Sequence, residues 1–326
     1  MPDIITHLVV GEVALEEGEY TSVLKENRNL FFLGCQGPDI FYYHKYLVFR
    51  IDKLGVKLAV QMHTKRTGEF LKNCFQCVSR EKNTFLFVYF SGFLLHYLTD
   101  RFIHPYVFYR SGRHPPDSPE RWEHKKLETS IDIEILNYYL GIPFKRYPYI
   151  RMVKVDEREY RPCFACLAER IPRFYNVDTD IENLIVESYQ HFLSALRFSR
   201  DLTGIKKNIL FPVLSGIMGL KFNLSVFVHP DRPYYHDPLN LSKREWRHPV
   251  TGEVYNKSVP DLVDETLDVY KGLMKDIYAF YLGDKKSLPS FFETDYSYDT
   301  GLPVNFNQEM RFFERAQVKE VKNGKR

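Results

Sequence analysis

The sequence predicts an all-α protein with long irregular loops, and three observations carry that prediction. Long stretches of its 326 residues place apolar side chains at positions i, i+3, i+4 and i+7, which is the spacing of one helix face. Stretches rich in Gly, Pro and Asp separate them, as is typical of turns between helices. No run of short alternating apolar and polar residues, which would indicate strands, competes with the helical pattern.

The predicted helices cover residues 5–18, 55–75, 84–104, 124–141, 180–202 and 258–283. The helix from residue 84 is expected to end near His104, because Pro105 disfavours helical backbone in the residue before it. The last helix begins at Ser258, a favourable N-cap, with Pro260 in the first turn, where proline is tolerated. Turn-rich connectors lie at 34–39, 113–120, 140–148 and 228–238.

The hydrophobic content of 44% is enough to fill a substantial core, and we expect a single all-α domain over residues 1–285. Residues 286–326 are expected to form a C-terminal extension. An aromatic, irregular stretch at about 229–257 lies within the domain, and connections of that length are often functional. The apolar window 208–228 is interrupted by Pro212, Lys221 and Asn223, which favours a buried helix over a membrane span and leaves a membrane-facing lip as the alternative.

Charge and cysteine usage restrict the class of protein. The 45 Lys and Arg residues against 42 Asp and Glu leave a net charge of +3, which gives no strong signal for nucleic-acid binding. The five cysteines are an odd number, typical of a reducing compartment, and the first residues MPDIITHLVV lack the features of a signal peptide. We therefore expect a cytoplasmic protein.

Two cysteine pairs, Cys74 with Cys77 and Cys163 with Cys166, have the C-x-x-C spacing of some zinc sites. Each pair lies within a helical pattern and lacks the turn residues of zinc knuckles. Buried thiols are therefore favoured over a site with four thiolates, and Cys35 is expected to pack in the core.

The stretch HYLTDRFIHP carries the strongest chemical signal. His96, Asp100 and His104 follow one another at i, i+4 spacing, which places them one turn apart on one helix face, with a drift of about 40° per step. Their surroundings, FLFVYFSGFLLHYLTDRFI, are apolar, and burying these polar groups without compensation costs several kcal/mol. A bound metal ion compensates such groups, so a metal site is favoured over a buried polar network.

His124 and Glu128 repeat the same spacing on the next predicted helix, a pairing that grips divalent cations such as Zn²⁺. An exposed surface pair beside Lys125 and Lys126 is the competing interpretation. Local spacing does not select His7, Asp39 or His63. Taken alone, Asp39 reads as a helix N-cap and His63 as a core histidine.

In chain order, these residues resemble the zinc-dependent phospholipase C and S1/P1 nuclease superfamily, in particular its bacterial zinc-dependent phospholipase C-like branch. The resemblance covers roughly residues 4–132. Its motifs are Thr6-His7, Gly37-Pro38-Asp39, His63, His96-x3-Asp100-x3-His104 and His124-x3-Glu128.

The resemblance implies a multi-helix phospholipase C or P1 nuclease-like bundle that holds two zinc ions, with a third possible. One zinc would be bound by Asp39, His63, His96 and Asp100, and a second by His104, His124 and Glu128. Asp100 would bridge to a third ion held by His7 and the chain's N-terminal amine and carbonyl. Asp39 is the candidate catalytic residue, because it would orient or deprotonate the water that attacks the phosphodiester.

The expected function is therefore a metal-dependent phosphoester hydrolase of phospholipase C type, whose substrate is a phosphoester and in one version a phospholipid. Phe41, Trp246 and His236 are candidates for the substrate pocket, although packing also explains the aromatic residues. Choline-preferring members place an aromatic residue directly after the first aspartate of the site, where this chain has Ile40, which argues against choline recognition.

Two alternatives stay open: a nuclease or nucleotide phosphatase on the same scaffold, and a non-catalytic helical binding module that uses metal for stability. An HD-type phosphohydrolase is disfavoured, because no His and Asp are adjacent among the candidate ligands. The sequence leaves the physiological substrate, the metal's identity and the oligomeric state open, together with peripheral membrane contact.

Overall fold

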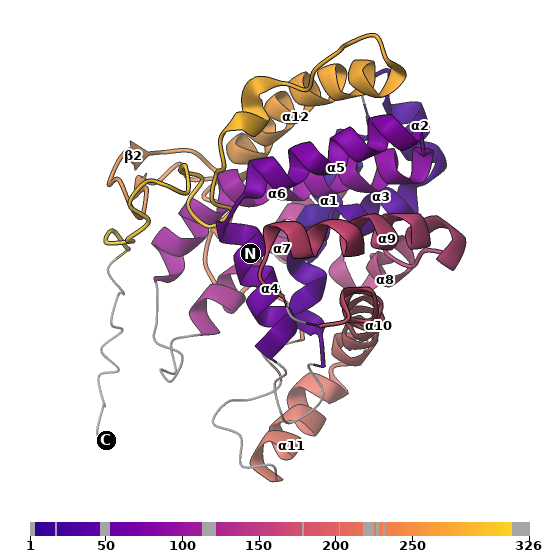
Figure 1. Ribbon diagram of the computed structural model, residues 1–326. Helices are drawn as coiled ribbons and strands as arrows, with labels where there is room; N and C mark the ends of the chain where they lie inside the picture. The colour runs from indigo at the N-terminus through magenta and orange to yellow at the C-terminus, as the bar shows by residue number, and fades with distance from the viewer. Residues whose placement is uncertain are drawn as a thin grey trace, which may run out of the picture.

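The computed structural model describes residues 4–16, 18–45, 53–112, 122–177, 179–201, 203–217, 225, 228–230 and 232–314. The described part is built almost entirely of helices, which confirms the all-α prediction (Figure 1). The helices and helical turns are α1 Ile4–Ala14, α2 Thr21–Glu26, α3 Arg28–Gly34, η1 Gly37–Tyr43, α4 Lys53–Thr64, α5 Thr67–Glu81, α6 Thr84–Ser111, α7 Glu123–Leu140, η3 Phe144–Arg146, α8 Tyr149–Met152, α9 Glu157–Phe174, α10 Ile181–Ser199, η4 Lys206–Leu210, α11 Phe211–Ile217, α12 Val259–Leu282 and η6 Ser290–Glu293.

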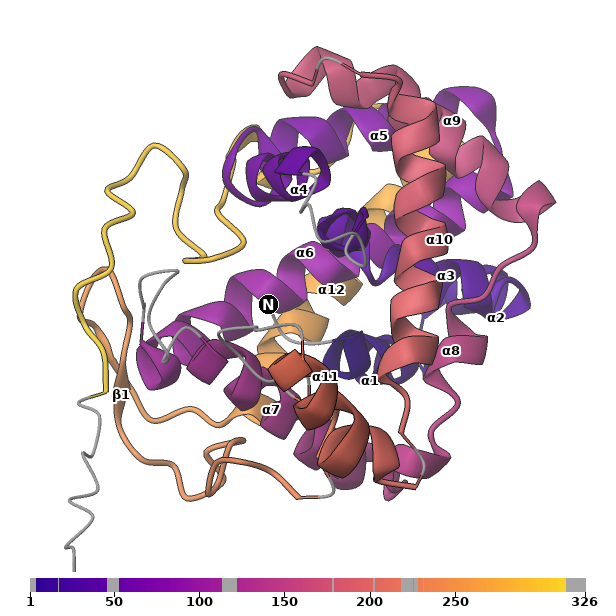
Figure 2. The same ribbon diagram turned by 90° about the horizontal axis from the view of Figure 1, so that it is seen from below.

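Helix α6 forms the centre of the bundle and packs against α1, α3, α5, α7, α9 and α12 (Figure 2). Asn83 starts it by accepting hydrogen bonds from the backbone N–H groups of Phe85 and Leu86. Its contact with α3 is unusually close, because a Cβ atom added at Gly34 would lie 2.2 Å from the carbonyl oxygen of Tyr89. The glycine allows α3 to deliver the following turn, residues 35–39, to the middle of α6.

Two predicted helix boundaries are wrong. Helix α6 does not end near His104 but continues through Pro105 to Ser111, because packing on several sides holds a helix that proline alone disfavours. The predicted helix 55–75 is two helices, α4 and α5, which are separated at Lys65 and Arg66. Arg66 has a left-handed backbone with φ of 49°, and this conformation interrupts the helix.

Of the apolar window 208–228, the structure describes residues 208–217, 225 and 228. The sequence predicted a buried helix here, and this prediction is wrong for residues 208–217. Ile209 and Ile217 of η4 and α11 are 61% and 78% exposed, so this short helical arm leaves a large apolar surface uncovered. The arm projects from the body of the molecule beyond the end of α10 (Figure 1). Among the described helices, none combines the length and apolar character needed to cross a membrane.

Helix α12 begins as expected. The Ser258 hydroxyl accepts a hydrogen bond from the backbone N–H of Asp261, and the Asp261 carboxylate accepts one from the backbone N–H of Ser258. The described part of 229–257 is irregular apart from one short antiparallel pair, β1 Trp246–Arg247 with β2 Val254–Tyr255. The connector at 113–120 lies outside the described residues, and the domain boundary near residue 285 stays a prediction.

After α12 the chain returns to the bundle in a segment that we call the C-terminal strap, residues 294–301. The Asp295 carboxylate accepts hydrogen bonds from the backbone N–H groups of Gly68 and Glu69 at the start of α5, at 2.9 and 3.0 Å. The Thr67 hydroxyl donates to the carbonyl of Tyr296 at 2.8 Å. These bonds hold the strap against α5 beside α6.

Candidate metal centre

Asp39 reaches the interior through the tight turn that begins η1. Gly37 has φ of 51°, a left-handed conformation that glycine adopts without a steric penalty. A Cβ atom at this position would lie 2.3 Å from Cδ2 of His96, so only glycine lets the turn approach α6 this closely. The Gly37-Pro38-Asp39 motif is therefore the means by which a carboxylate from outside α6 reaches the histidine on it.

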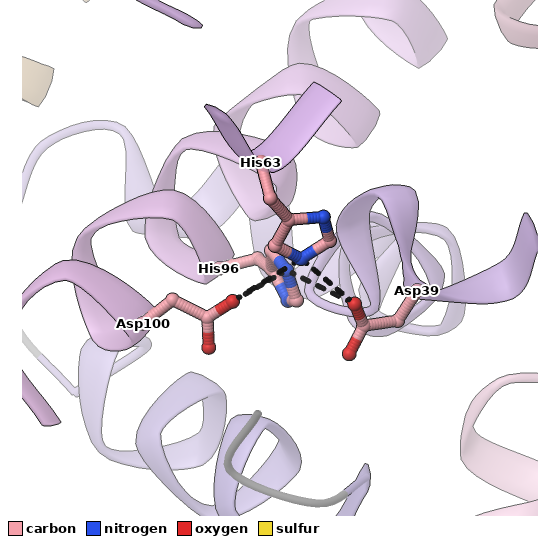
Figure 3. Close-up of side chains that lie close together, drawn as sticks. All are labelled: Asp39, His63, His96 and Asp100. Carbon is pink, nitrogen blue, oxygen red and sulfur yellow. Dashed lines mark ion pairs between the residues drawn. The ribbon is translucent and has the colours of Figure 1, made fainter. Parts of the chain in front are cut away.

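Four side chains meet at this point and form what we call the first ligand set: Asp39, His63, His96 and Asp100 (Figure 3). One potential ligand atom from each lies within 4.8 Å of the others. Nε2 of His63 is 3.1 Å from Oδ1 of Asp39, and Nε2 of His96 is 3.2 Å from Oδ2 of Asp100. Figure 3 shows the two carboxylates facing the two imidazoles from opposite sides, a geometry that surrounds a single point.

A second ligand set, His104, His124 and Glu128, lies further along α6 and on α7. Nε2 of His124 is 2.8 Å from Oε1 of Glu128, and the rings of His104 and His124 are 6.2 Å apart. Asp100 lies between the two sets, because its Oδ2 faces His96 while its Oδ1 is 3.9 Å from Nε2 of His104. The structure thus brings together both sets that the sequence analysis grouped.

The imidazole rings are oriented by hydrogen bonds on their outer nitrogens. Nδ1 of His63 donates to the carbonyl of Ala59 at 2.7 Å, and Nδ1 of His96 donates to that of Cys35 at 3.1 Å. Because a carbonyl only accepts, these bonds place the proton of a neutral ring on Nδ1 and leave the Nε2 lone pair facing inward. Metal-binding histidines show this arrangement.

His7, in the first turns of α1, completes the neighbourhood of Asp100. Its ring stacks on that of His96 with centroids 4.2 Å apart, and its Nε2 is 3.3 Å from Oδ1 of Asp100. The other predicted ligands of a third ion, the N-terminal amine and carbonyl, lie outside the described residues. The structure therefore places His7 beside Asp100, and the third site stays a prediction.

The buried polar atoms supply the test of whether a cation fits. Oδ1 of Asp39, both carboxylate oxygens of Asp100 and Nε2 of the histidines at 7, 63, 96 and 104 are buried and form no hydrogen bond in the described part of the chain. Burying such groups without partners costs several kcal/mol. Oxygen and imidazole nitrogen are ligands that Zn²⁺ accepts, so divalent cations bound at the ligand sets would satisfy these atoms. The residues present fit a metal ion.

Burial and neighbouring charges shift the pKa values of side chains in the first ligand set. Burial would lower the pKa of His63, but the carboxylates of Asp100 and Asp39 raise it to about 10. Burial lowers the pKa of His96 despite the opposing effect of Asp100. Although burial would raise the pKa of Asp100, His104 and His96 hold it well below its usual value. Without metal, the first set therefore carries a proton on His63.

The three residues predicted to line the substrate pocket lie in different surroundings. Phe41 is fully buried in the hydrophobic core. Trp246 is 3% exposed, packs on Tyr106 and Tyr255, and donates a hydrogen bond from Nε1 to the carbonyl of Lys257. His236 is exposed at the surface. The two aromatic rings are used in packing, and the substrate-binding role of all three stays a prediction.

Two side chains near the ligand sets were not named individually by the sequence analysis. The Tyr42 ring is 5.7 Å from that of His63, and its pKa is raised by burial and by the negative charge of Asp39. Asp299 of the C-terminal strap lines a pocket together with Thr64, the residue after His63, and burial raises its pKa. The sequence placed Tyr42 only within the aromatic run DIFYYHKY, and Asp299 has no local signal because it is distant in the chain from every motif.

The cysteine pairs behave as buried thiols. Sγ of Cys77 lies 3.7 Å from Sγ of Cys166, while Cys163 faces the backbone carbonyls of Phe85 and Glu159. All five cysteines are buried. Among the described residues, no cluster of three or more potential ligand atoms includes a cysteine, in agreement with the favoured interpretation.

Comparison with known proteins supports the metal site. A protein-family model described as zinc dependent phospholipase C matches residues 6–195, which is more than half of the chain. The matched range contains all eight predicted metal ligands and ends before the loop 229–257, α12 and the C-terminal strap. No curated protein and no solved structure matches the chain.

Proposed function

The chain belongs to the zinc-dependent phospholipase C family, and on that premise we propose that it is a phosphodiester hydrolase that acts on a phospholipid-like substrate. The observation that carries the proposal is Asp100, which lies between two ligand sets and approaches a histidine of each, His96 at 3.2 Å and His104 at 3.9 Å. Two adjacent cation sites are the arrangement used to hold both the attacking and the leaving oxygen of a phosphoryl group.

In this proposal the first ligand set holds one zinc ion and the second set holds another. His7 and the second carboxylate oxygen of Asp100 offer two ligand atoms to a third ion. Bound zinc supplies positive charge that neutralises a phosphate and lowers the pKa of water toward neutrality.

The chain's own residues have distinct tasks. Asp39 is the carboxylate of the first set that comes from outside α6, and it is 8% exposed whereas Asp100 is fully buried. We assign to Asp39 the role of orienting the attacking water and accepting its proton. Tyr42, three residues later in η1, is half-buried beside His63 and would contact the substrate near Asp39.

The exposed arm formed by η4 and α11 supports a lipid substrate over a nucleic acid. Ile205, Ile209, Val213 and Ile217 are each at least half exposed and recur every four residues, so they form an apolar stripe along the arm. Such a stripe is suited to lie in the interface of a bilayer. A nuclease would need aromatic rings free to stack on bases, and the ring of Trp246 already packs on Tyr106 and Tyr255.

The test measures zinc per chain by plasma mass spectrometry on protein purified without chelator, together with hydrolysis of phospholipid vesicles, a water-soluble phosphodiester and single-stranded DNA. We expect at least two zinc ions and release of a phosphorylated headgroup. Asp39→Asn should keep the fold and lose at least 100-fold of the rate, about the size of a general-base contribution.

Asp268→Asn, an exposed aspartate on α12, is the matched control and should retain full activity. A folded, zinc-loaded wild type that hydrolyses DNA but no lipid would replace the phospholipase with the nuclease. Full retention of metal without any phosphodiesterase activity would favour the non-catalytic binding module.

A further inference from the structure

The C-terminal strap lies outside the range matched by the family model, yet it contacts the metal centre directly. The carbonyl of Tyr298 accepts the hydrogen bond from Nδ1 of His104 at 3.0 Å. The backbone N–H of the same residue donates to the carbonyl of His63 at 3.0 Å. One strap residue is thus bonded to a histidine of each ligand set.

The bond to His104 has a specific consequence for metal binding. It places the proton of the neutral ring on Nδ1 and leaves Nε2, a buried atom without a hydrogen bond, facing Asp100 and the second set. In the first set the equivalent acceptors for His63 and His96 are supplied by Ala59 and Cys35, inside the matched range. For His104 the acceptor is supplied by the strap.

A break in the hydrogen bonding of α6 helps to position the strap. Pro105 has no N–H, so it cannot bond to the carbonyl of Arg101 four residues earlier. Gly301, with φ of 68°, lies against this carbonyl so closely that an added Cβ would be 2.5 Å from its oxygen. The Arg101 side chain donates in return to the carbonyl of Gly301 at 3.4 Å and lies 3.6 Å from the centroid of the Tyr296 ring.

The strap also brings a carboxylate to the site. Asp299 lines a pocket of about 240 Å³ together with Thr64, which follows His63, and Phe108, whose ring is 4.7 Å from that of His124. It is the one charged side chain among the described lining residues. Burial raises its pKa, whereas the charge of His63 acts in the opposite direction. The pocket therefore places Asp299 close to residues that neighbour His63 and His124.

We propose that the C-terminal strap is part of the metal centre: Tyr298 positions His104 for metal binding, and Asp299 adds a carboxylate in the adjoining pocket. This inference rests on the proposed metal-dependent function. It extends the site beyond the family's matched range to a segment that reaches the centre only through tertiary packing.

Two matched glycine variants test the positioning role. Gly301→Ala forces a left-handed backbone on alanine and a clash with the Arg101 carbonyl, whereas Gly141→Ala has a similar φ of 62° but open space around the added Cβ. Zinc affinity is measured by competition with a fluorescent chelator, and circular dichroism and thermal melting check the fold. Loss of an outer hydrogen-bond partner typically weakens metal binding about 10- to 100-fold. We expect that loss for one zinc equivalent in Gly301→Ala, and wild-type affinity in Gly141→Ala.

Asp299→Asn leaves the backbone contacts of the strap in place and keeps the test decisive if Gly301→Ala does not fold. Loss of its charge in the pocket next to the site should weaken zinc binding about 10-fold while the melting curve stays cooperative. Wild-type zinc affinity in folded Gly301→Ala, or in Asp299→Asn, overturns the corresponding role of the strap. A wild-type protein that binds no zinc would instead remove the proposed function itself, so the two failures are distinguishable.

Discussion

Zinc binding by the first ligand set should release about one proton at pH 7, and the source of that proton is His63. Its neighbours Asp100 and Asp39 raise its pKa to about 10, about three units above the assay pH, so the metal-free ring is protonated. A protonated imidazole cannot bind zinc, so the proton must leave as the metal arrives. His96 contributes none, because burial lowers its pKa and it is already neutral.

The size of the effect follows from the same value. Removing a proton about three units below its pKa costs about 4 kcal/mol at about 1.4 kcal/mol per unit, or roughly a thousandfold in apparent affinity. Between pH 6.5 and 8.5 the apparent zinc affinity should therefore rise about tenfold per unit. The metal-free protein has the opposite dependence: a raised histidine pKa stabilises the fold fully below about 6.5, and that stability is lost as pH rises through about 10.

The assay is isothermal titration calorimetry of zinc in three buffers of different ionisation enthalpy at pH 7. The slope of the observed enthalpy against that ionisation enthalpy gives the number of protons released. His63→Gln should remove the release and weaken binding, whereas the surface variant His236→Gln should match wild type. A slope of zero in wild-type protein that binds zinc tightly would refute the reasoning, because His63 would then be neutral between its two carboxylates.

Three further predictions address the site and its surroundings. Gly37→Ala should cost about 1–2 kcal/mol for its left-handed backbone and displace His96, so a lower melting temperature and loss of one zinc are expected, and full zinc content would contradict the role of this turn. Asp100→Asn should reduce zinc at both ligand sets, measured by mass spectrometry, whereas loss from a single set would show that Asp100 is not shared. Ile209→Ser with Ile217→Ser should lower sedimentation with anionic vesicles and leave hydrolysis of a soluble phosphodiester unchanged, and equal vesicle binding would exclude the arm as a lipid contact.

The sequence by itself determined the parts of the site that depend on local geometry. The positions of His96, Asp100 and His104 on one helix face, and of His124 and Glu128 on another, follow from the 3.6-residue turn, which needs no knowledge of the fold. The all-α class followed for the same reason. His7, Asp39 and His63 were named only because the ordered motifs resemble a known family, since no local spacing selects them.

Only the tertiary structure decided how these pieces meet. The continuation of α6 through Pro105, the approach of the Gly37 turn to His96 and the position of the strap depend on packing between segments far apart in the chain. The same packing brought Tyr42 and Asp299 to the metal centre and left the arm at η4 and α11 exposed. The physical reason is that helical periodicity fixes the neighbours of a residue within a turn, whereas contacts between distant segments arise from the joint packing of all the helices.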